Sequence, residues 1–131
     1  MLFVCVGNCC RSQMAEGFAT HYGRDVLVAE SAGLAPAGVV VDETVRSMAQ
    51  RNIDISRHHS KALRTDRTDG YDLIVNMSGF SLPDGVRAPA VAWKIPDPIG
   101  QSDEVYARVR DQIEALVLDL ISKFRTGPLQ P

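Results

Sequence analysis

The sequence lacks any hydrophobic run near the roughly 18 residues that a membrane-spanning helix needs. It also begins without the basic segment and cleavage-site pattern of a secretory signal. Lys and Arg do not gather in one block, and the formal net charge is −2. These absences argue against a nucleic-acid partner or a membrane surface, so we expect a cytoplasmic protein whose anion site is local.

Cysteine is scarce and confined to one place. The chain has three cysteines, Cys5, Cys9 and Cys10, and none follows residue 10. There is no Cys-x2-Cys pair and no histidine nearby, so we expect no metal site and no cofactor. In a cytoplasmic chain such thiols are more often reactive or inert than bridged for stability.

Strand-like and helix-like patterns alternate along the chain. At 131 residues it is long enough to bury a core, and we expect one domain over 1–131. The pattern predicts strands at 2–6, 26–30, 71–77 and 89–95. It predicts helices at 12–22, from an N-cap at Asp42, and from a cap at Ser102 to a stop at Gly127 and Pro128. This alternation predicts an α/β fold: a parallel sheet with helices on both faces.

The loop after the first strand combines the parts of an oxyanion site. Ligands bind at the carboxyl ends of parallel strands, and this loop lies at such an end. Gly7 and Asn8 tolerate positive φ, so the backbone can turn its N–H groups inward as an anion nest at a helix N-terminus. Arg11 can donate two hydrogen bonds to a tetrahedral anion. The predicted substrate-binding residues form one run: Val6, Gly7, Asn8, Cys9, Cys10, Arg11 and Ser12.

Cys5 is the predicted nucleophile at the base of this nest. A positive environment favours the thiolate, and Ser12 can donate a hydrogen bond to it. Asp97 is the predicted general acid, because a phosphate ester needs a proton for its leaving oxygen. It stands between Pro96 and Pro98 after a predicted strand, which places it at the same edge of the sheet. Alternatively, Asp97 is a turn residue in a proline-rich loop.

Several segments together resemble a known family. "LFVCVGNCCRSQMAE" is similar to the phosphate loop of low-molecular-weight protein tyrosine phosphatases and of the arsenate reductases that share their fold. "ESAGL", "YDLIVNM", "PDPIG" and the long last helix follow in the family order. The resemblance covers nearly the whole chain and implies a three-layer fold with a four-stranded parallel sheet.

The resemblance also implies roles for individual residues. Cys5 would form a phosphocysteine, Arg11 would bind the phosphoryl oxygens, and Asp97 would act first as acid and then as base. Cys10 matches a second loop cysteine that forms a reversible, protective disulfide with the nucleophile. The polar network that supports the loop would comprise Asn8, Ser12, Ser31 and His58, with the adjacent His59 as the alternative to His58.

Two departures from the family pattern leave the reaction open. Gln13 and Trp93 are closer to the arsenate reductases, yet the region after the third strand lacks the further cysteines that the thioredoxin-coupled enzymes use. Tyrosine-specific phosphatases usually carry an aromatic residue where this chain has Ile99. Cys9 occupies a variable loop position, and its small size leaves phosphoarginine open as a substrate.

Three functions follow in order of preference. The first is a phosphomonoester hydrolase that acts on protein phosphotyrosine, a similar phosphoamino acid or a small phosphate ester. The second is an arsenate reductase that uses an external thiol reductant of the glutathione or mycothiol type. The third is a non-catalytic module that keeps the oxyanion cradle for recognition or redox sensing.

Overall fold

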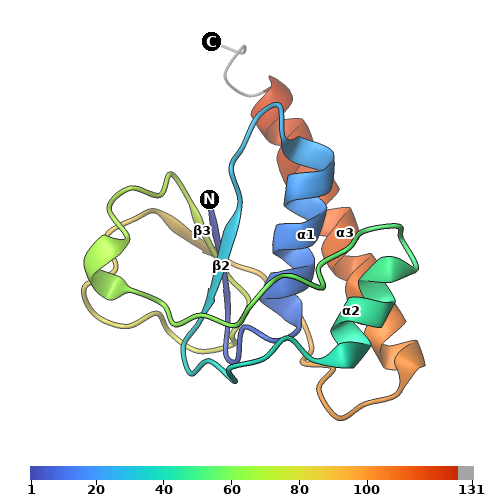
Figure 1. Ribbon diagram of the computed structural model, residues 1–131. Coiled ribbons are helices and arrows are strands. Elements are labelled where there is room, and N and C mark those ends of the chain that lie inside the picture. Colours follow the sequence, from blue (N-terminus) through green and yellow to red (C-terminus); the bar gives the residue numbers. More distant parts are fainter. Residues whose placement is uncertain (127–131) are drawn as a thin grey trace.

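The computed structural model describes residues 1–126 as a sheet of four short strands with three α-helices (Figure 1). The elements in chain order are β1 (Leu2–Cys5), α1 (Arg11–Gly23), β2 (Glu30–Gly33), α2 (Asp42–Ala49), the 3-10 helix η1 (Thr65–Arg67), β3 (Ile74–Asn76), β4 (Ala90–Ala92) and α3 (Asp103–Thr126).

All strand pairs are parallel, in the order β2-β1-β3-β4. β1 is therefore central and pairs with both β2 and β3, with Leu2 opposite Glu30 on one side and Ile74 on the other. Parallel pairing brings the carboxyl ends of all four strands to one edge. The loop that follows Cys5 lies at that edge, as the sequence predicts.

The three α-helices cover one face of the sheet, to the right of the strands in Figure 1. α1 packs against α2 and α3, and α2 also packs against α3. Phe3 and Val75 point from the sheet into this layer, where they join buried residues of α1 and α3 such as Phe18 and Ile113. Because strand side chains alternate between faces, Leu2, Val4 and Ile74 form a second cluster on the opposite face.

The opposite face is covered by irregular chain together with η1, at the left of Figure 1. Leu63, Tyr71, Leu82 and Val86 from these segments pack against the second cluster. The α/β class and the four-stranded parallel sheet with helices are thus confirmed. The second covering layer contains a single short helical turn, because residues 50–73 and 77–89 run mostly as loops.

Several predicted element boundaries are wrong. The third and fourth strands, predicted at 71–77 and 89–95, are shorter, since β3 spans Ile74–Asn76 and β4 spans Ala90–Ala92. The second strand is predicted at 26–30, but β2 begins at Glu30 and continues through buried Ser31, Ala32 and Gly33. The predicted N-cap Asp42 lies inside α2, whose N-cap is Val41, without a side-chain cap. The predicted stop of the last helix at Gly127 and Pro128 lies outside the described residues.

The last helix begins as predicted. The Ser102 hydroxyl accepts a hydrogen bond from the backbone N–H of Val105 at 3.3 Å. Asp103 and Glu104 follow in the first turn, where negative charge suits the helix dipole. None of the helices among residues 1–126 is long and apolar enough to cross a membrane.

Candidate active site

The loop between β1 and α1 turns its carbonyl groups outward. The backbone N–H groups of Leu34, Ala35 and Ala37 donate to the carbonyls of Cys5, Val6 and Gly7 at 2.8 to 3.0 Å. The loop that follows β2 therefore fastens the oxyanion loop along its outer side. Within residues 1–126, the N–H groups of Gly7, Cys9 and Cys10 donate no hydrogen bond, so they remain available to an anion.

Asn8 is the residue that gives the loop its shape. It adopts a left-handed conformation with φ 48° and is fully buried. Its side-chain amide donates to Ser12 Oγ at 2.7 Å, and its Oδ1 accepts from the backbone N–H of Lys61 at 2.8 Å. These bonds hold an otherwise uncommon backbone conformation.

Gly33 permits the close approach of β2 to this loop. A Cβ atom at this position would lie 2.7 Å from the carbonyl oxygen of Val6 and 2.9 Å from the backbone nitrogen of Asn8. Both are backbone atoms, which cannot swing aside as a flexible side chain can. Glycine is therefore required here for steric reasons.

Cys5 ends β1 and points its sulfur into the loop. Ser12 Oγ lies 2.9 Å from Cys5 Sγ, and the backbone N–H of Asn8 donates to the same sulfur at 3.3 Å. The residue is buried, with 2% of its surface exposed. The geometry provides two hydrogen-bond donors for a thiolate, as the sequence predicts for a nucleophile.

Arg11 joins the loop to the ends of two other strands. Its Nη1 donates to the carbonyl oxygens of Met77 and Ile95, at 2.7 and 3.1 Å. Its Nη2 lies 3.7 Å from the Asp97 carboxylate, whose side chain is 46% exposed. Asp97 Oδ1 also accepts from the N–H of Ile99, which fixes the turn between the prolines. Arg11 and Asp97, 86 positions apart in sequence, thus meet at the loop.

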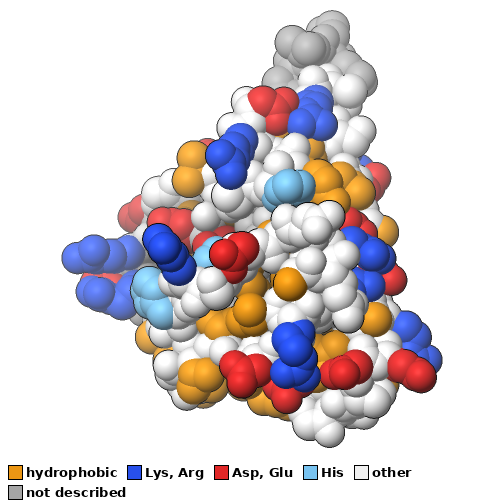
Figure 2. Space-filling view, turned by 45° about the vertical axis from the view of Figure 1, so that its right-hand side comes forward, with side chains coloured by type: hydrophobic (Ala, Val, Ile, Leu, Met, Phe, Trp, Pro, Cys, Tyr) orange, Lys and Arg blue, Asp and Glu red, His pale blue; other side chains and the backbone are white. Residues whose placement is uncertain are grey.

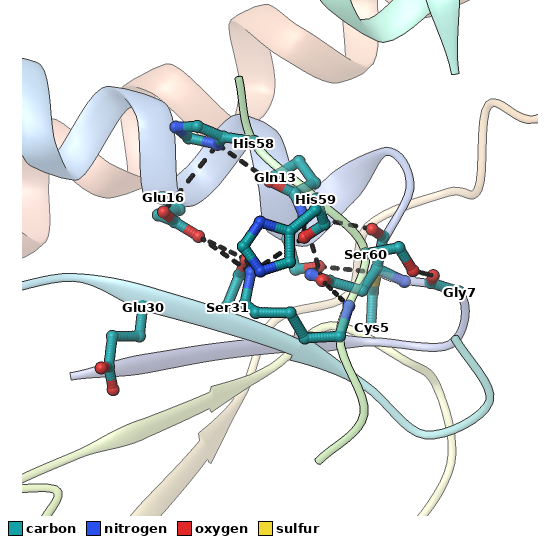
Figure 3. Close-up of polar contacts among 12 residues, drawn as sticks. Cys5, Gly7, Gln13, Glu16, Glu30, Ser31, His58, His59 and Ser60 are labelled. Atoms are coloured by element: carbon teal, nitrogen blue, oxygen red, sulfur yellow. Dashed lines mark hydrogen bonds and ion pairs between the residues drawn. The ribbon is translucent and has the colours of Figure 1, made fainter. Parts of the chain in front are cut away.

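A buried polar network extends from the loop to α1 (Figure 3). Gln13 Nε2 donates to the backbone and side-chain oxygens of Asn8 and to the carbonyl of His59. Gln13 Oε1 lies 2.9 Å from His58 Nδ1, which is also 3.8 Å from a Glu16 carboxylate oxygen. Of the two adjacent histidines, the structure therefore brings the side chain of His58 into this network.

Residues 58–61 form a strap across the loop. The Ser60 hydroxyl donates to the carbonyl of Gly7 at 2.9 Å. Lys61 Nζ donates to the carbonyl of His59 and to Ser31 Oγ, at 3.0 and 3.4 Å, and lies 3.9 Å from Glu16. The Ser31 hydroxyl in turn donates to Glu16. Ser31 thus reaches the loop through the strap, by way of Lys61.

Cys9 and Cys10 form a second sulfur pair in the same loop, with Sγ atoms 3.6 Å apart. The hydrogen bond between the two sulfurs lowers the pKa of Cys10 to about 7, although burial opposes this shift. The same hydrogen bond, followed by burial, raises the pKa of Cys9. The Tyr106 hydroxyl lies 3.6 Å from Cys10 Sγ and helps to stabilise the thiolate. The predicted disulfide between Cys10 and Cys5 stays a prediction.

The structure brings the predicted site residues together at one edge of the sheet. Sequence reasoning missed the support roles of Gln13, Glu16, Ser60 and Lys61, and the contact of Tyr106 with Cys10. A signal existed for Gln13, which is a polar residue in the buried first turn of α1. The strap had no such signal, because no regular pattern marks it. Within residues 1–126, no three His, Cys, Asp or Glu side chains form a group that could hold a metal ion.

Lys and Arg side chains are interspersed with Asp and Glu on the face in Figure 2.

A hollow of about 400 Å³ lies beside β2, between Leu2, Leu63 and Tyr71. It shares Glu16, Ser31 and Lys61 with the network but does not include Cys5. Ile99, which stands where tyrosine-specific phosphatases usually carry an aromatic residue, is exposed.

Comparisons of sequence and of structure with known proteins agree on one family and one fold. Residues 1–127 match the family described as low molecular weight phosphotyrosine protein phosphatase. A glutaredoxin arsenate reductase of Synechocystis sp. is 36% identical over 94% of this chain and 96% of its own. The structure of an arsenate reductase in the phosphate-binding state superposes with a TM-score of 0.87 and 36% identity, over 94% of this chain and 96% of that one. A low molecular weight protein tyrosine phosphatase from T. tengcongensis superposes with a TM-score of 0.77 and 30% identity, over 93% and 97%.

Proposed function

This chain belongs to the low molecular weight phosphotyrosine protein phosphatase family, and from that premise we propose that it is an arsenate reductase that takes its electrons from an external thiol. The family shares one oxyanion site between two chemistries, ester hydrolysis and arsenate reduction. The observation that carries the choice is that two relatives, each 36% identical to this chain, are named arsenate reductases. Both align with it over most of their length. They favour this function over the hydrolase preferred from sequence alone.

The first step is the capture of arsenate by Cys5. Arsenate is a tetrahedral oxyanion, which suits the free N–H groups of the loop and the Arg11 guanidinium. The Cys5 thiolate attacks arsenic, and a sulfur–arsenic bond forms as one oxygen leaves. Asp97 lies on the exposed side of Arg11 and protonates this oxygen, which departs as water.

The second step needs two electrons that thiols must supply. An external thiolate attacks Cys5 Sγ, the sulfur–arsenic bond breaks, and its electron pair stays on arsenic, which leaves as arsenite. Cys5 is then a mixed disulfide with the reductant. A second thiol exchanges with it and restores the Cys5 thiolate, so one arsenate and two thiols give arsenite, one disulfide and water.

The source of the thiols follows from the sequence. No cysteine follows residue 10, so a relay through distant cysteines of this chain does not exist. A low-molecular-weight thiol of the glutathione or mycothiol type, with its protein partner, supplies the electrons in this proposal. We place the reaction in the cytoplasm, where such thiols are kept reduced.

Hydrolysis of a phosphate monoester is the second candidate. The position of Asp97 favours it, because an acid beside Arg11 can protonate the leaving oxygen of an ester as well as that of arsenate. Cys5 would attack phosphorus, and Asp97 would then activate the water that hydrolyses the phosphocysteine.

A paired assay on one preparation of reduced protein separates the two functions. One arm follows arsenate reduction with the thioredoxin, glutathione–glutaredoxin and mycothiol systems in turn. The other arm follows hydrolysis of p-nitrophenyl phosphate, and Cys5→Ser is the control in both. We expect arsenate reduction with a low-molecular-weight thiol, feeble ester hydrolysis, and no turnover by Cys5→Ser.

Other outcomes have equally clear meanings. Ester hydrolysis without arsenate reduction under any thiol system refutes the reductase and makes phosphotyrosine versus phosphoarginine the next comparison. Turnover that persists in Cys5→Ser refutes the assignment of the nucleophile in either reaction.

A further inference from the structure

The proposed reaction uses Cys5 and leaves two reduced thiols of the same loop unassigned. Cys9 and Cys10 are adjacent in sequence, and their Sγ atoms lie 3.6 Å apart in the hydrophobic core. Cys9 is 5% exposed and Cys10 is 2% exposed. Both side chains belong to the hydrophobic core, and the Tyr106 hydroxyl of α3 lies 3.6 Å from Cys10 Sγ.

We propose that Cys9 and Cys10 form a binding site for trivalent arsenic, separate from the nucleophile Cys5. Trivalent arsenic is a soft centre that prefers sulfur ligands. Two thiols held side by side bind it far more tightly than two independent thiols, because the second bond forms within the molecule. The 3.6 Å separation allows one atom to bridge both sulfurs without a large movement of either side chain.

The binding step is a condensation and involves no oxidation. Arsenous acid carries three hydroxyl groups. Two sulfur–arsenic bonds form, two arsenic–oxygen bonds break, and the two thiol protons leave with the hydroxyls as two waters. Arsenic stays trivalent, both sulfurs stay at the thiolate level, and one hydroxyl remains on arsenic.

An unpartnered hydroxyl beside the pair supports a ligand at this place. Thr44 is fully buried, and its Oγ1 has no hydrogen-bond partner of normal geometry within residues 1–126. Its hydroxyl belongs to the surroundings of Cys10 and helps to lower the pKa of that thiol. A buried hydroxyl without a partner costs free energy, and the hydroxyl left on arsenic would offer it one.

Gly7 gives the Cys9 sulfur room on the loop side. A Cβ atom at residue 7 would lie 3.0 Å from Cys9 Sγ, so any larger residue would press on the sulfur. The pair therefore has a donor-lined side, towards Thr44 and Tyr106, and a side that faces the loop backbone.

Occupation of the pair would affect the oxyanion site directly. Cys9 and Cys10 belong to the run whose N–H groups form the predicted nest, so a bridge between them fixes two of its residues. The binding itself requires only the two thiols and holds for a hydrolase as well. Its meaning as feedback by the product rests on the proposed arsenate reduction.

The test measures binding of phenylarsine oxide, which reacts with two thiols, and does not depend on turnover. Three variants each leave one pair of cysteines: Cys5→Ser leaves 9 and 10, Cys9→Ser leaves 5 and 10, and Cys10→Ser leaves 5 and 9. Each protein is titrated to equilibrium, with intact-mass detection and 2,3-dimercaptopropanol as the competing dithiol. We expect Cys5→Ser to bind one equivalent as tightly as wild type, and the other two to bind about 100-fold more weakly or worse.

A second measurement on wild type removes any dependence on how the variants fold. The complex is unfolded in urea and alkylated with iodoacetamide, and fragmentation of the peptide 1–11 locates the label. We expect the label on Cys5 alone. Loss of binding in Cys5→Ser, binding by all three variants with equal affinity, or a label on Cys9 or Cys10 would each overturn the proposal.

Discussion

At the residue scale, Asp97 combines two properties that a proton donor at this loop needs. Its carboxylate lies 3.7 Å from Arg11 Nη2, yet its side chain is nearly half exposed. Arg11 is held by two carbonyl oxygens and cannot follow if the carboxylate moves. The pair therefore presents one fixed cation and one accessible acid to the same anion.

Asp97→Asn should slow the first chemical step without weakening anion binding. The amide cannot protonate the departing oxygen, and general acid catalysis typically contributes about 100-fold or more. We expect kcat for arsenate reduction to fall by about that factor, while the inhibition constant of phosphate stays the same or decreases because a negative charge is removed. An unchanged kcat, measured where chemistry limits the rate, would contradict the assignment.

A second prediction at this scale concerns Cys10 and the pH dependence of the free energy of unfolding. Its pKa is lowered to about 7 in the folded protein by the Cys9 hydrogen bond, whereas an unfolded thiol titrates near 8.5. Between these values the unfolded chain binds more protons than the folded one, so the free energy of unfolding should rise with pH. Below pH 7 both states are protonated and this contribution is absent.

The measurement is the free energy of unfolding in urea for wild type and Cys10→Ala, at pH 6, 7 and 9 with a reductant. The difference between the two proteins should grow by about 0.5 to 1 kcal/mol from pH 7 to pH 9. The growth is smaller than Cys10 alone would give, because the raised pKa of Cys9 keeps a proton in the folded state that the unfolded chain loses above about pH 8.5. Cys9→Ala should lose most of this growth, because Cys10 then lacks the hydrogen bond that contributes most to its lowered pKa. A difference that is flat across the range would show that Cys10 is not a thiolate in the folded protein.

Individual residues also show which parts of the site could be predicted from the sequence. Cys5, Arg11 and Asp97 were identifiable because each stands in a distinctive local context of strand, glycine or proline. Gln13 and Lys61 were not, since their importance comes from partners 46 and 53 positions away. Hydrogen bonds between distant segments leave no periodic signal in the chain.

At the element scale, β2 shows why a strand boundary predicted from local pattern is wrong. Residues 26–29 are apolar, which favours a strand, but Val28 is 80% exposed. The strand instead uses Ser31, Ala32 and Gly33, which are small enough to lie beneath α1 and against the loop. Packing against a neighbouring element overrides local β propensity in this case.

Gly33→Ala should damage the loop more than the sheet. The added methyl group meets the backbone of Val6 and Asn8, and overpacking of this kind costs about 1 to 3 kcal/mol. We expect a loss of stability in that range and a weaker affinity for phosphate. Gly70→Ala is the matched control, because a Cβ atom there meets nothing within 4 Å. Equal behaviour of the two variants would show that the close contact is unimportant.

At the scale of the whole molecule, the oxyanion loop is joined to most of the fold. It bonds to the segment after β2, to the strap at 58–61, and through Arg11 to the ends of β3 and β4. A ligand that binds this loop should therefore stabilise the entire protein against unfolding. A ligand that binds only the folded state adds about 2.7 kcal/mol at 100 times its Kd.

Phosphate should raise the melting temperature by several degrees, with sodium chloride at equal ionic strength as the control. Arg11→Lys keeps the charge but loses the planar guanidinium that binds two oxygens at once. We expect its phosphate-dependent shift to be much smaller than that of wild type. A full shift in Arg11→Lys would mean that the anion binds elsewhere on the protein.

The central position of β1 has a consequence for the state of the chain during its synthesis. β1 carries Cys5 and pairs with β3, whose last residue is Asn76. At about 5 to 20 residues per second, ribosomal synthesis takes several seconds to pass from one to the other. Throughout that interval the first strand has no partner on one side, and the three thiols lack the packing that later buries them. The thiols of the nascent chain are therefore most accessible to oxidants before the protein has folded and become active.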